Sequence, residues 1–119
     1  MGDGRPIAQS VLERHLCAML DHEEIPPVVG QAVAPWAPWA AGDEFVDALI
    51  ETWDMLVEGD GRLWHARLTA MENDRRRDHE AQRRGLIVVR FGIVELRDDP
   101  AGCRRHLVET ARSFGRLSA

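Results

Sequence analysis

Two short apolar runs, Phe45–Ile50 and Met55–Asp60, are separated by only four residues. This spacing constrains the fold more than any other feature of the chain. Each run has the length of an ordinary β-strand, and a gap of this size is typical of a hairpin. The sequence therefore predicts two neighbouring strands joined by a turn at residues 51–54.

Three acidic residues lie in these runs, at Asp47, Glu58 and Asp60. Side chains two residues apart on a strand point the same way, so Glu58 and Asp60 share a face, which Asp47 joins if its strand lies alongside. Crowded carboxylates repel one another unless a cation separates them, and hard divalent cations prefer oxygen ligands. We expect a Mg²⁺ or Mn²⁺ site that hydrolyses phosphate esters. The alternative is a set of acids at exposed strand ends with no shared role.

The rest of the chain alternates between helical and strand patterns, and its 119 residues correspond to one domain. The expected elements are a helix from Ile7 to Leu20, strands at 28–33, 45–50 and 55–60, a helix at 68–84, a strand at 86–91 and a helix opening at Asp98-Asp99-Pro100. The order α-β-β-β-α-β-α indicates an α/β domain, a mixed sheet flanked by helices.

Several of these segments carry a further prediction about burial. In the helix at 68–84, Asp78 and Ala81 fall on the inward face, and Gly85 ends the helix. The run Leu86–Phe91 has the pattern of a strand buried on both faces. The last helix has an apolar stripe of Cys103, Leu107, Ala111 and Phe114.

The net charge of −5 conceals two halves of opposite sign. Residues 1–60 carry two Arg and twelve acids (2 − 12 = −10), whereas residues 61–119 carry thirteen Arg and eight acids (13 − 8 = +5). One half could hold a metal while the other meets phosphate, or the two halves could simply attract each other. The chain contains no lysine, so a mechanism that needs a catalytic lysine is excluded.

Several arginines are candidates for contacts to a DNA backbone. Arg62 and Arg67 lie close to the acids in the sequence, and Arg75 and Arg77 belong to a run of three arginines in the helix at 68–84. The alternative for that helix is a solvated face with salt bridges along it.

Other features place the chain in a broad class. No apolar stretch approaches the roughly 20 residues that span a membrane, and no signal peptide is visible, so we expect a cytoplasmic protein. Cys17 and Cys103 lack metal-ligand spacing and are expected to be small buried residues.

Taken together, the motifs resemble the very-short-patch repair endonuclease-like family, a branch of the PD-(D/E)xK (restriction-endonuclease-like) superfamily. The similarity covers about residues 10–112, and the family motifs occur in the family's order. The matching residues are Ser10-Val11-Leu12-Glu13, Pro26-Pro27, Val46-Asp47, Glu58-Gly59-Asp60-Gly61, Trp64-His65, Asp74, Arg77-Asp78, Gly85, Val88 and Arg90-Phe91.

This resemblance implies a restriction-endonuclease-like fold and roles for individual residues. Asp47 and Glu58 match metal-binding acids, and Asp60 stands where relatives carry lysine or histidine. His65 matches a histidine near the scissile phosphate, a candidate general acid or base, and Glu13 matches an acid of the first helix. Trp64 falls where the repair enzymes wedge a residue into the base stack.

The chain also departs from the family pattern. Gly59 stands where relatives have an apolar strand residue, Leu86 replaces an aromatic, and the zinc cysteines of the repair enzymes are missing.

The expected function is a metal-dependent DNA endonuclease or nickase in repair or in defence against phages and mobile elements. The alternative is a catalytically silent binding module, because related domains occur in AbiEi-like antitoxins and other defence proteins. Such a module could act as a homodimer or with a partner protein.

Overall fold

The secondary structure follows the expected order, with one additional helix near the C-terminus. The structure is a computed structural model, and it describes residues 9–30, 45–60 and 71–117. Its helices are α1 (Gln9–Leu20), α3 (Met71–Arg83), α4 (Ile93–Asp98) and α5 (Pro100–Ser113), with a 3-10 turn η2 (Glu51–Trp53); its strands are β1 (Val29–Gly30), β2 (Phe45–Ile50), β3 (Met55–Asp60) and β4 (Ile87–Gly92).

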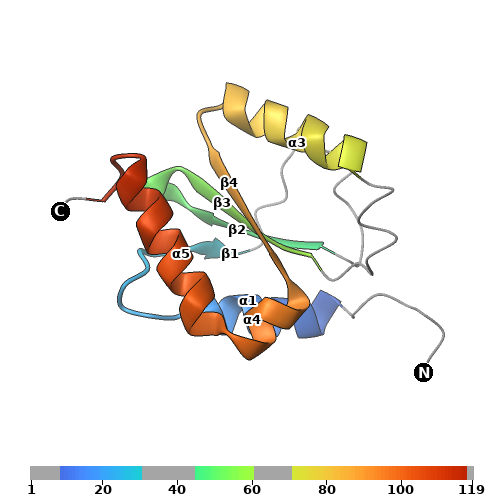
Figure 1. The fold of residues 1–119 in the computed structure, drawn as a ribbon, viewed down its shortest axis with the longest axis vertical. Coiled ribbons are helices and arrows are strands. Elements are labelled where there is room, and N and C mark those ends of the chain that lie inside the picture. The colour runs from blue at the N-terminus through green and yellow to red at the C-terminus, as the bar shows by residue number, and fades with distance from the viewer. Residues whose placement is uncertain (1–8, 31–44, 61–70, 118–119) are drawn as a thin grey trace.

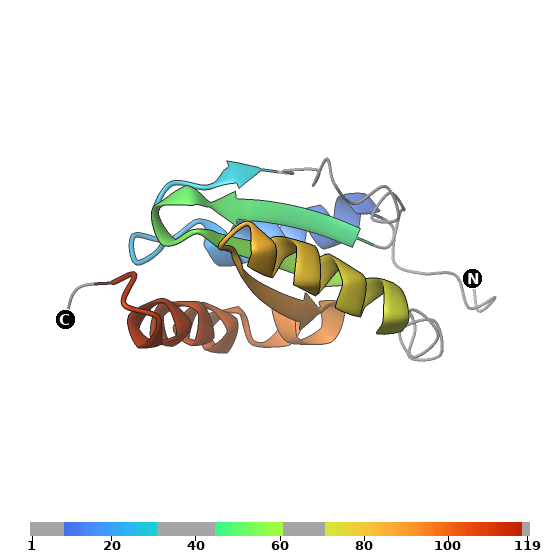
Figure 2. The same cartoon turned by 90° about the horizontal axis from the view of Figure 1, so that it is seen from above.

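The four strands form one mixed sheet in the order β1-β2-β3-β4, which can be followed from top to bottom in Figure 2. The pairs β1–β2 and β2–β3 are antiparallel, and β4 runs parallel to β3. The hairpin between β2 and β3 closes at Asp54, whose left-handed φ of 51° reverses the chain. The bounds of β2 and β3 are those predicted from the sequence.

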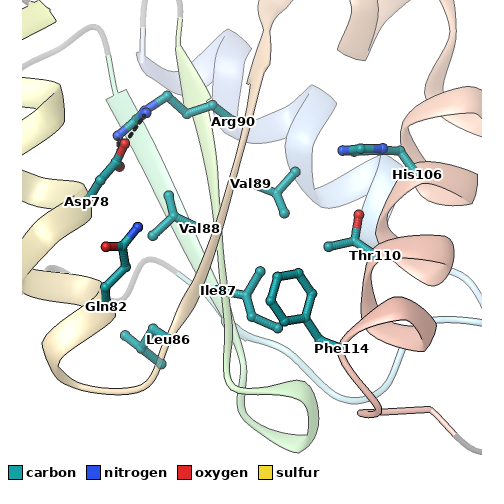
Figure 3. A pocket seen from close by; sticks show the side chains of 10 residues that line it. All are labelled: Asp78, Gln82, Leu86, Ile87, Val88, Val89, Arg90, His106, Thr110 and Phe114. Atoms are coloured by element: carbon teal, nitrogen blue, oxygen red, sulfur yellow. Dashed lines mark hydrogen bonds and ion pairs between the residues drawn. The ribbon is translucent and has the colours of Figure 1, made fainter.

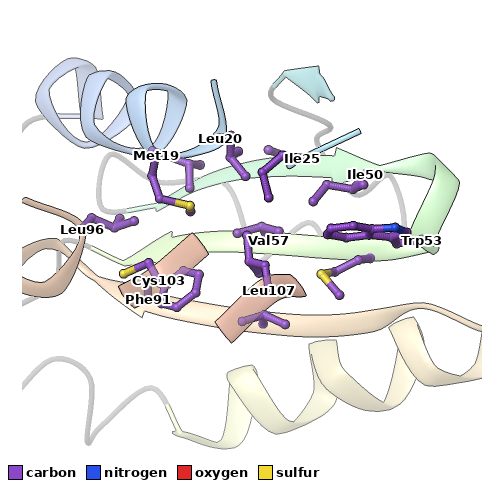
Figure 4. Close-up of a cluster of buried hydrophobic side chains, with 14 of the residues drawn as sticks. Met19, Leu20, Ile25, Ile50, Trp53, Val57, Phe91, Leu96, Cys103 and Leu107 are labelled. Atoms are coloured by element: carbon purple, nitrogen blue, oxygen red, sulfur yellow. The ribbon is translucent and has the colours of Figure 1, made fainter. Parts of the chain in front are cut away.

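The sheet has two unlike faces. Figure 1 shows α3 on one side of it and α1, α4 and α5 on the other. Alternate strand residues point to the second side and build one apolar cluster with these three helices (Figure 4). Its strand members are Ala48, Ile50, Met55, Val57, Val89 and Phe91, and its helix members include Leu12, Leu16, Met19, Leu96 and Leu107. Each large apolar side chain among them contributes about 1.5–3 kcal/mol through burial.

The other face is covered by α3, which contacts β4. Leu56 and Ala81 are buried on this side, outside the main cluster. The acidic positions of β3 also lie here, because they alternate with Met55 and Val57 of the opposite face. The fold therefore separates a purely apolar core from a layer in which charged and apolar groups are buried together.

Local signals determine where the helices begin and end. Gly85 has a φ of 78°, and the amides of Gly85 and Leu86 donate to the carbonyls of Gln82 and Ala81, which is the Schellman arrangement that ends α3. At α5, Asp99 Oδ1 accepts from the Gly102 amide at 3.0 Å and Pro100 occupies the first turn.

The last helical segment differs from its prediction in two ways. It begins at Pro100, as predicted, but a short helix that was not predicted, α4, precedes it, and the amide of Gly92 donates to Oε1 of Glu95 at 3.0 Å to begin α4. Cys103, Leu107 and Ala111 are buried as expected, but Phe114 follows the end of α5 and is 60% exposed. The stripe therefore stops at Ala111.

Two further burial predictions are wrong. β4, at one end of the sheet, is only alternately buried, whereas every residue of β3 is buried. The strand enclosed on both faces is therefore the one that carries Glu58 and Asp60. Cys17 is exposed, and only Cys103 fits the expectation of a small buried residue.

Some predictions lie outside what the structure describes. They include residues 31–33 of the strand predicted at 28–33, of which Val29 and Gly30 form β1. None of the helices in the described segments is long and apolar enough to cross a membrane.

Candidate functional site

Glu58 and Asp60 lie at the C-terminal end of β3. Both are almost completely buried, with 1% and 2% of their surface exposed. Acidic side chains are rarely enclosed to this degree unless they are paired, because removing a carboxylate from water costs several kcal/mol. The two acids are therefore not solvated residues at an exposed strand end, which was the alternative considered from the sequence.

The register of β2 brings a third acidic position to the same place. Asp47 lies directly opposite Glu58, and Phe45 lies opposite Asp60. Directly opposed positions of an antiparallel pair belong to the same face of a sheet. Asp47, Glu58 and Asp60 therefore share the α3 face at the level of the backbone, as the sequence predicted. The side chain of Asp47 is outside the described part of the structure.

A basic residue that sequence reasoning did not place in the site stands next to Glu58. Arg90 is the register partner of Glu58 in the parallel pairing of β4 with β3. Its Nε lies 2.7 Å from Oε1 of Glu58. The sequence did contain a signal, because a charged residue within the apolar run Leu86–Phe91 needs a partner once the strand is folded.

Arg90 also reaches across to α3. Its Nη2 donates to Oδ1 of Asp78 at 2.6 Å and its Nη1 to Oδ2 at 3.3 Å, a two-pronged contact between guanidinium and carboxylate. Figure 3 shows Arg90 and Val88 pointing toward α3, while Val89 points toward α5. The inward position predicted for Asp78 is correct, and its partner is Arg90.

This arrangement modifies the electrostatic argument made from the sequence. A divalent cation was expected to relieve the repulsion among the acids, whereas the structure shows a cation of the protein itself beside Glu58. Arg90 divides one positive charge between Glu58 and Asp78, so it neutralises neither carboxylate fully.

A groove of about 620 Å³ runs along β4 between α3 and α5 (Figure 3). Asp78 and Arg90 form one end of it, and its lining further includes Gln82, Leu86, Val88 and Phe114. Glu58 and Asp60 are not among its lining residues. The groove therefore reaches the ion pair of Arg90 with Asp78 but stops short of the two buried acids.

The structure describes two of the three predicted metal ligands as side chains, Glu58 and Asp60. Among the side chains that it describes, no group of three or more His, Cys, Asp or Glu residues is arranged to hold a metal ion. Since Asp47 is outside that set, the predicted three-acid site stays a prediction.

Glu13 is half-buried in α1, the helix layer on the opposite face of the sheet from Glu58 and Arg90. Its assignment to the site also stays a prediction.

The remaining predicted site residues fall into two groups. Arg75 is exposed on α3, as a contact to DNA requires, and Arg77 belongs to the same helix but its side chain is not described. Arg62, Trp64, His65 and Arg67 lie outside the described residues.

Cys103 is buried in the apolar cluster on the other face of the sheet. Burial, assisted by the negative charges of Glu95 and Asp99, raises the pKa of its thiol to about 11. His106, three residues further along α5, instead makes an edge-to-face ring contact with Phe91, with centroids 6.0 Å apart.

Comparisons with known proteins add no relative to these observations. No protein-family model matches the chain, and no similar protein was found among the curated proteins or the solved structures.

Proposed function

We propose that the chain is a metal-dependent DNA endonuclease or nickase with a restriction-endonuclease-like fold. The observation that carries the proposal is the enclosure of Glu58 and Asp60, 1% and 2% exposed, on one face of the central strand, with the Asp47 position opposite Glu58. Buried acidic groups that lie together are candidates for a functional site.

The residues present fit a hard divalent cation. Carboxylate oxygens are the preferred ligands of Mg²⁺ and Mn²⁺, and Asp47, Glu58 and Asp60 would hold the ion. When bound, such an ion activates water and stabilises negative charge on a phosphodiester undergoing attack. Arg90 limits the repulsion among these acids without neutralising them, which leaves them able to attract a cation.

The family resemblance supports the same proposal. The described elements follow the order α-β-β-β-α-β-α, with the short helix α4 added before the final helix. In this proposal His65 and Glu13 assist proton transfer or orient water. The DNA contacts are Arg62, Trp64, Arg67, Arg75 and Arg77, of which Arg75 is exposed on α3. We further propose a cytoplasmic role in DNA repair or in defence against mobile elements.

The direct test is cleavage of supercoiled plasmid in the presence of Mg²⁺ or Mn²⁺. Asp47→Ala and Asp60→Asn should abolish conversion to nicked or linear DNA. Asp98→Asn is the matched control, because Asp98 is an exposed acid of α4 paired with Arg97. Metal-dependent cleavage that survives Asp47→Ala would refute the assignment of the site.

A second function is favoured by one specific observation, the ion pair between Arg90 and Glu58. If Arg90 replaces a metal ion permanently, the domain is a catalytically silent binding module of a toxin–antitoxin or defence protein, acting as a homodimer or with a partner protein. Metal titration separates the two functions. A metal site should add about 2.7 kcal/mol of stability at 100 times its Kd, seen as a rise in Tm, whereas a silent module should show no rise.

A further inference from the structure

Three charged side chains form a continuous line from helix α3 to the buried acid of β3. Asp78 in α3 contacts both terminal nitrogens of Arg90, and Nε of the same guanidinium contacts Glu58. The line therefore crosses three elements that are far apart in the sequence, α3, β4 and β3.

The geometry of the guanidinium makes this line stiff. The two contacts with Asp78, at 2.6 and 3.3 Å, are hydrogen bonds, and a planar guanidinium held at both terminal nitrogens cannot rotate without breaking one of them. The contact of Nε with Oε1 of Glu58, at 2.7 Å, is an ion pair. The side chain of Arg90 is 24% exposed and that of Asp78 is 34% exposed, whereas Glu58 is 1% exposed, so the line runs from the surface inward.

We propose that Arg90 is a positioning residue for the carboxylate of Glu58, and that Asp78 in turn holds Arg90 in place. This inference rests on the proposed function, in which Glu58 is a metal ligand. A carboxylate that ligates a metal needs a fixed orientation, and its outer partners supply it. Arg90 orients Glu58 from the neighbouring strand, so the packing of α3 on the sheet sets the geometry of the metal site.

The contacts of Arg90 use three different nitrogens of one guanidinium. A lysine would keep the positive charge next to Glu58, but its single nitrogen cannot reproduce this spaced set of contacts. The variant Arg90→Lys therefore keeps the positive charge at residue 90 and removes the forked shape of the guanidinium.

The experiment measures the Kd for Mn²⁺ by calorimetry and the rate of plasmid cleavage at saturating Mn²⁺. We expect Arg90→Gln to weaken Mn²⁺ binding about 10–100-fold, the usual effect of losing an outer partner of a metal ligand. Arg90→Lys should restore part of the affinity, and Asp78→Asn should weaken binding in the same direction. Arg97→Gln is the matched control, because Arg97 pairs with Asp98 on the surface and should leave the Kd unchanged.

The outcomes distinguish this inference from the proposed function. If the wild-type protein binds no Mn²⁺, the proposed function is wrong, and this inference falls with it. If the wild-type protein binds Mn²⁺ and Arg90→Gln and Asp78→Asn leave the Kd unchanged or make binding tighter, only the positioning role is overturned, because Arg90 then acts merely as a charge that competes with the metal. Circular dichroism monitors folding, and if Arg90→Gln does not fold, Asp78→Asn decides, because it retains the contact of Arg90 with Glu58.

Discussion

Arg90 and Glu58 face each other across the parallel strands β4 and β3, with Nε of Arg90 2.7 Å from Oε1 of Glu58. The side chain of Glu58 is 1% exposed and that of Arg90 is 24% exposed, so both charges are largely buried. Removing one partner of such a pair leaves the other as an isolated charge in a region of low polarity. The stability of the α3 side of the sheet therefore depends on both charges being present together.

Arg90→Leu should lower the free energy of unfolding by about 3 kcal/mol, near the lower end of the range for buried pairs because Arg90 remains partly exposed. The double variant Arg90→Leu/Glu58→Gln should recover part of this loss, since no uncompensated charge is left at Glu58. Urea denaturation monitored by circular dichroism measures both. A single-variant loss below about 1 kcal/mol, typical of a surface pair, would contradict the prediction.

Leu107 and Phe114 test where the apolar stripe of α5 ends. Leu107 is fully buried, so Leu107→Ala should cost about 2–5 kcal/mol through lost burial and the cavity left behind. Phe114 is 60% exposed, so Phe114→Ala should change stability by less than about 0.5 kcal/mol. Thermal or urea unfolding of the two variants gives the comparison. Equal losses would mean that Phe114 belongs to the core.

The two cysteines should differ sharply in reactivity. Cys17 is exposed, whereas burial together with Glu95 and Asp99 raises the pKa of Cys103 to about 11. Only the thiolate reacts with iodoacetamide. At pH 8 the folded protein should therefore incorporate one label, on Cys17, and two labels in denaturant. Mass spectrometry of the labelled peptides checks the result, and rapid labelling of Cys103 in the folded protein would disprove it.

The same pKa shift makes stability depend on alkaline pH. Because the pKa of Cys103 is raised on folding from 9.0 to about 11, the folded protein favours the neutral thiol. The stabilisation from Cys103 is complete below about pH 9 and is lost as the pH rises toward 11. The difference in unfolding free energy between the wild type and Cys103→Ala should therefore decrease across this window. Urea titrations at pH 8 and 10.5 measure it, and a constant difference would contradict the assignment.

Glycine is favoured at position 85 because of the backbone conformation there, not because a larger side chain would clash. Its φ is 78°, and a Cβ added there would meet nothing within 4 Å. Gly85→Ala should therefore cost about 1–2 kcal/mol, the penalty of a left-handed conformation for a residue with a Cβ. Gly85→Asn should cost less, because asparagine tolerates this region better. A neutral Gly85→Ala variant in thermal unfolding would show that α3 can end in another way.

The parts of the fold that could be predicted are those specified by neighbours in the sequence. The bounds of β2 and β3 follow from two apolar runs and a hairpin gap. The end of α3 follows from Gly85, and the start of α5 follows from the pair Asp99-Pro100. By contrast, α4 has only six residues and begins through the contact of Glu95 with the Gly92 amide, which leaves too short a periodic pattern to detect.

The candidate site likewise has a part that could be predicted from the sequence and a part that could not. The face shared by Glu58 and Asp60 follows from their spacing along one strand, and the position of Asp47 follows from the hairpin. The role of Arg90 could not be predicted in this manner, because its partners come from β3 and α3, at residues 58 and 78. Sequence spacing says nothing about which residues of a parallel pair stand opposite each other.

Local chemistry thus defined the helices and strands of this chain and the acidic face of its hairpin, because spacing along one segment determines side-chain direction. Packing between distant segments decided that β3, not β4, is enclosed on both sides, and that Arg90 stands between Glu58 and Asp78. The physical reason is that burial and charge pairing are properties of neighbours in space, which exist only once α3 and β4 have docked on β3.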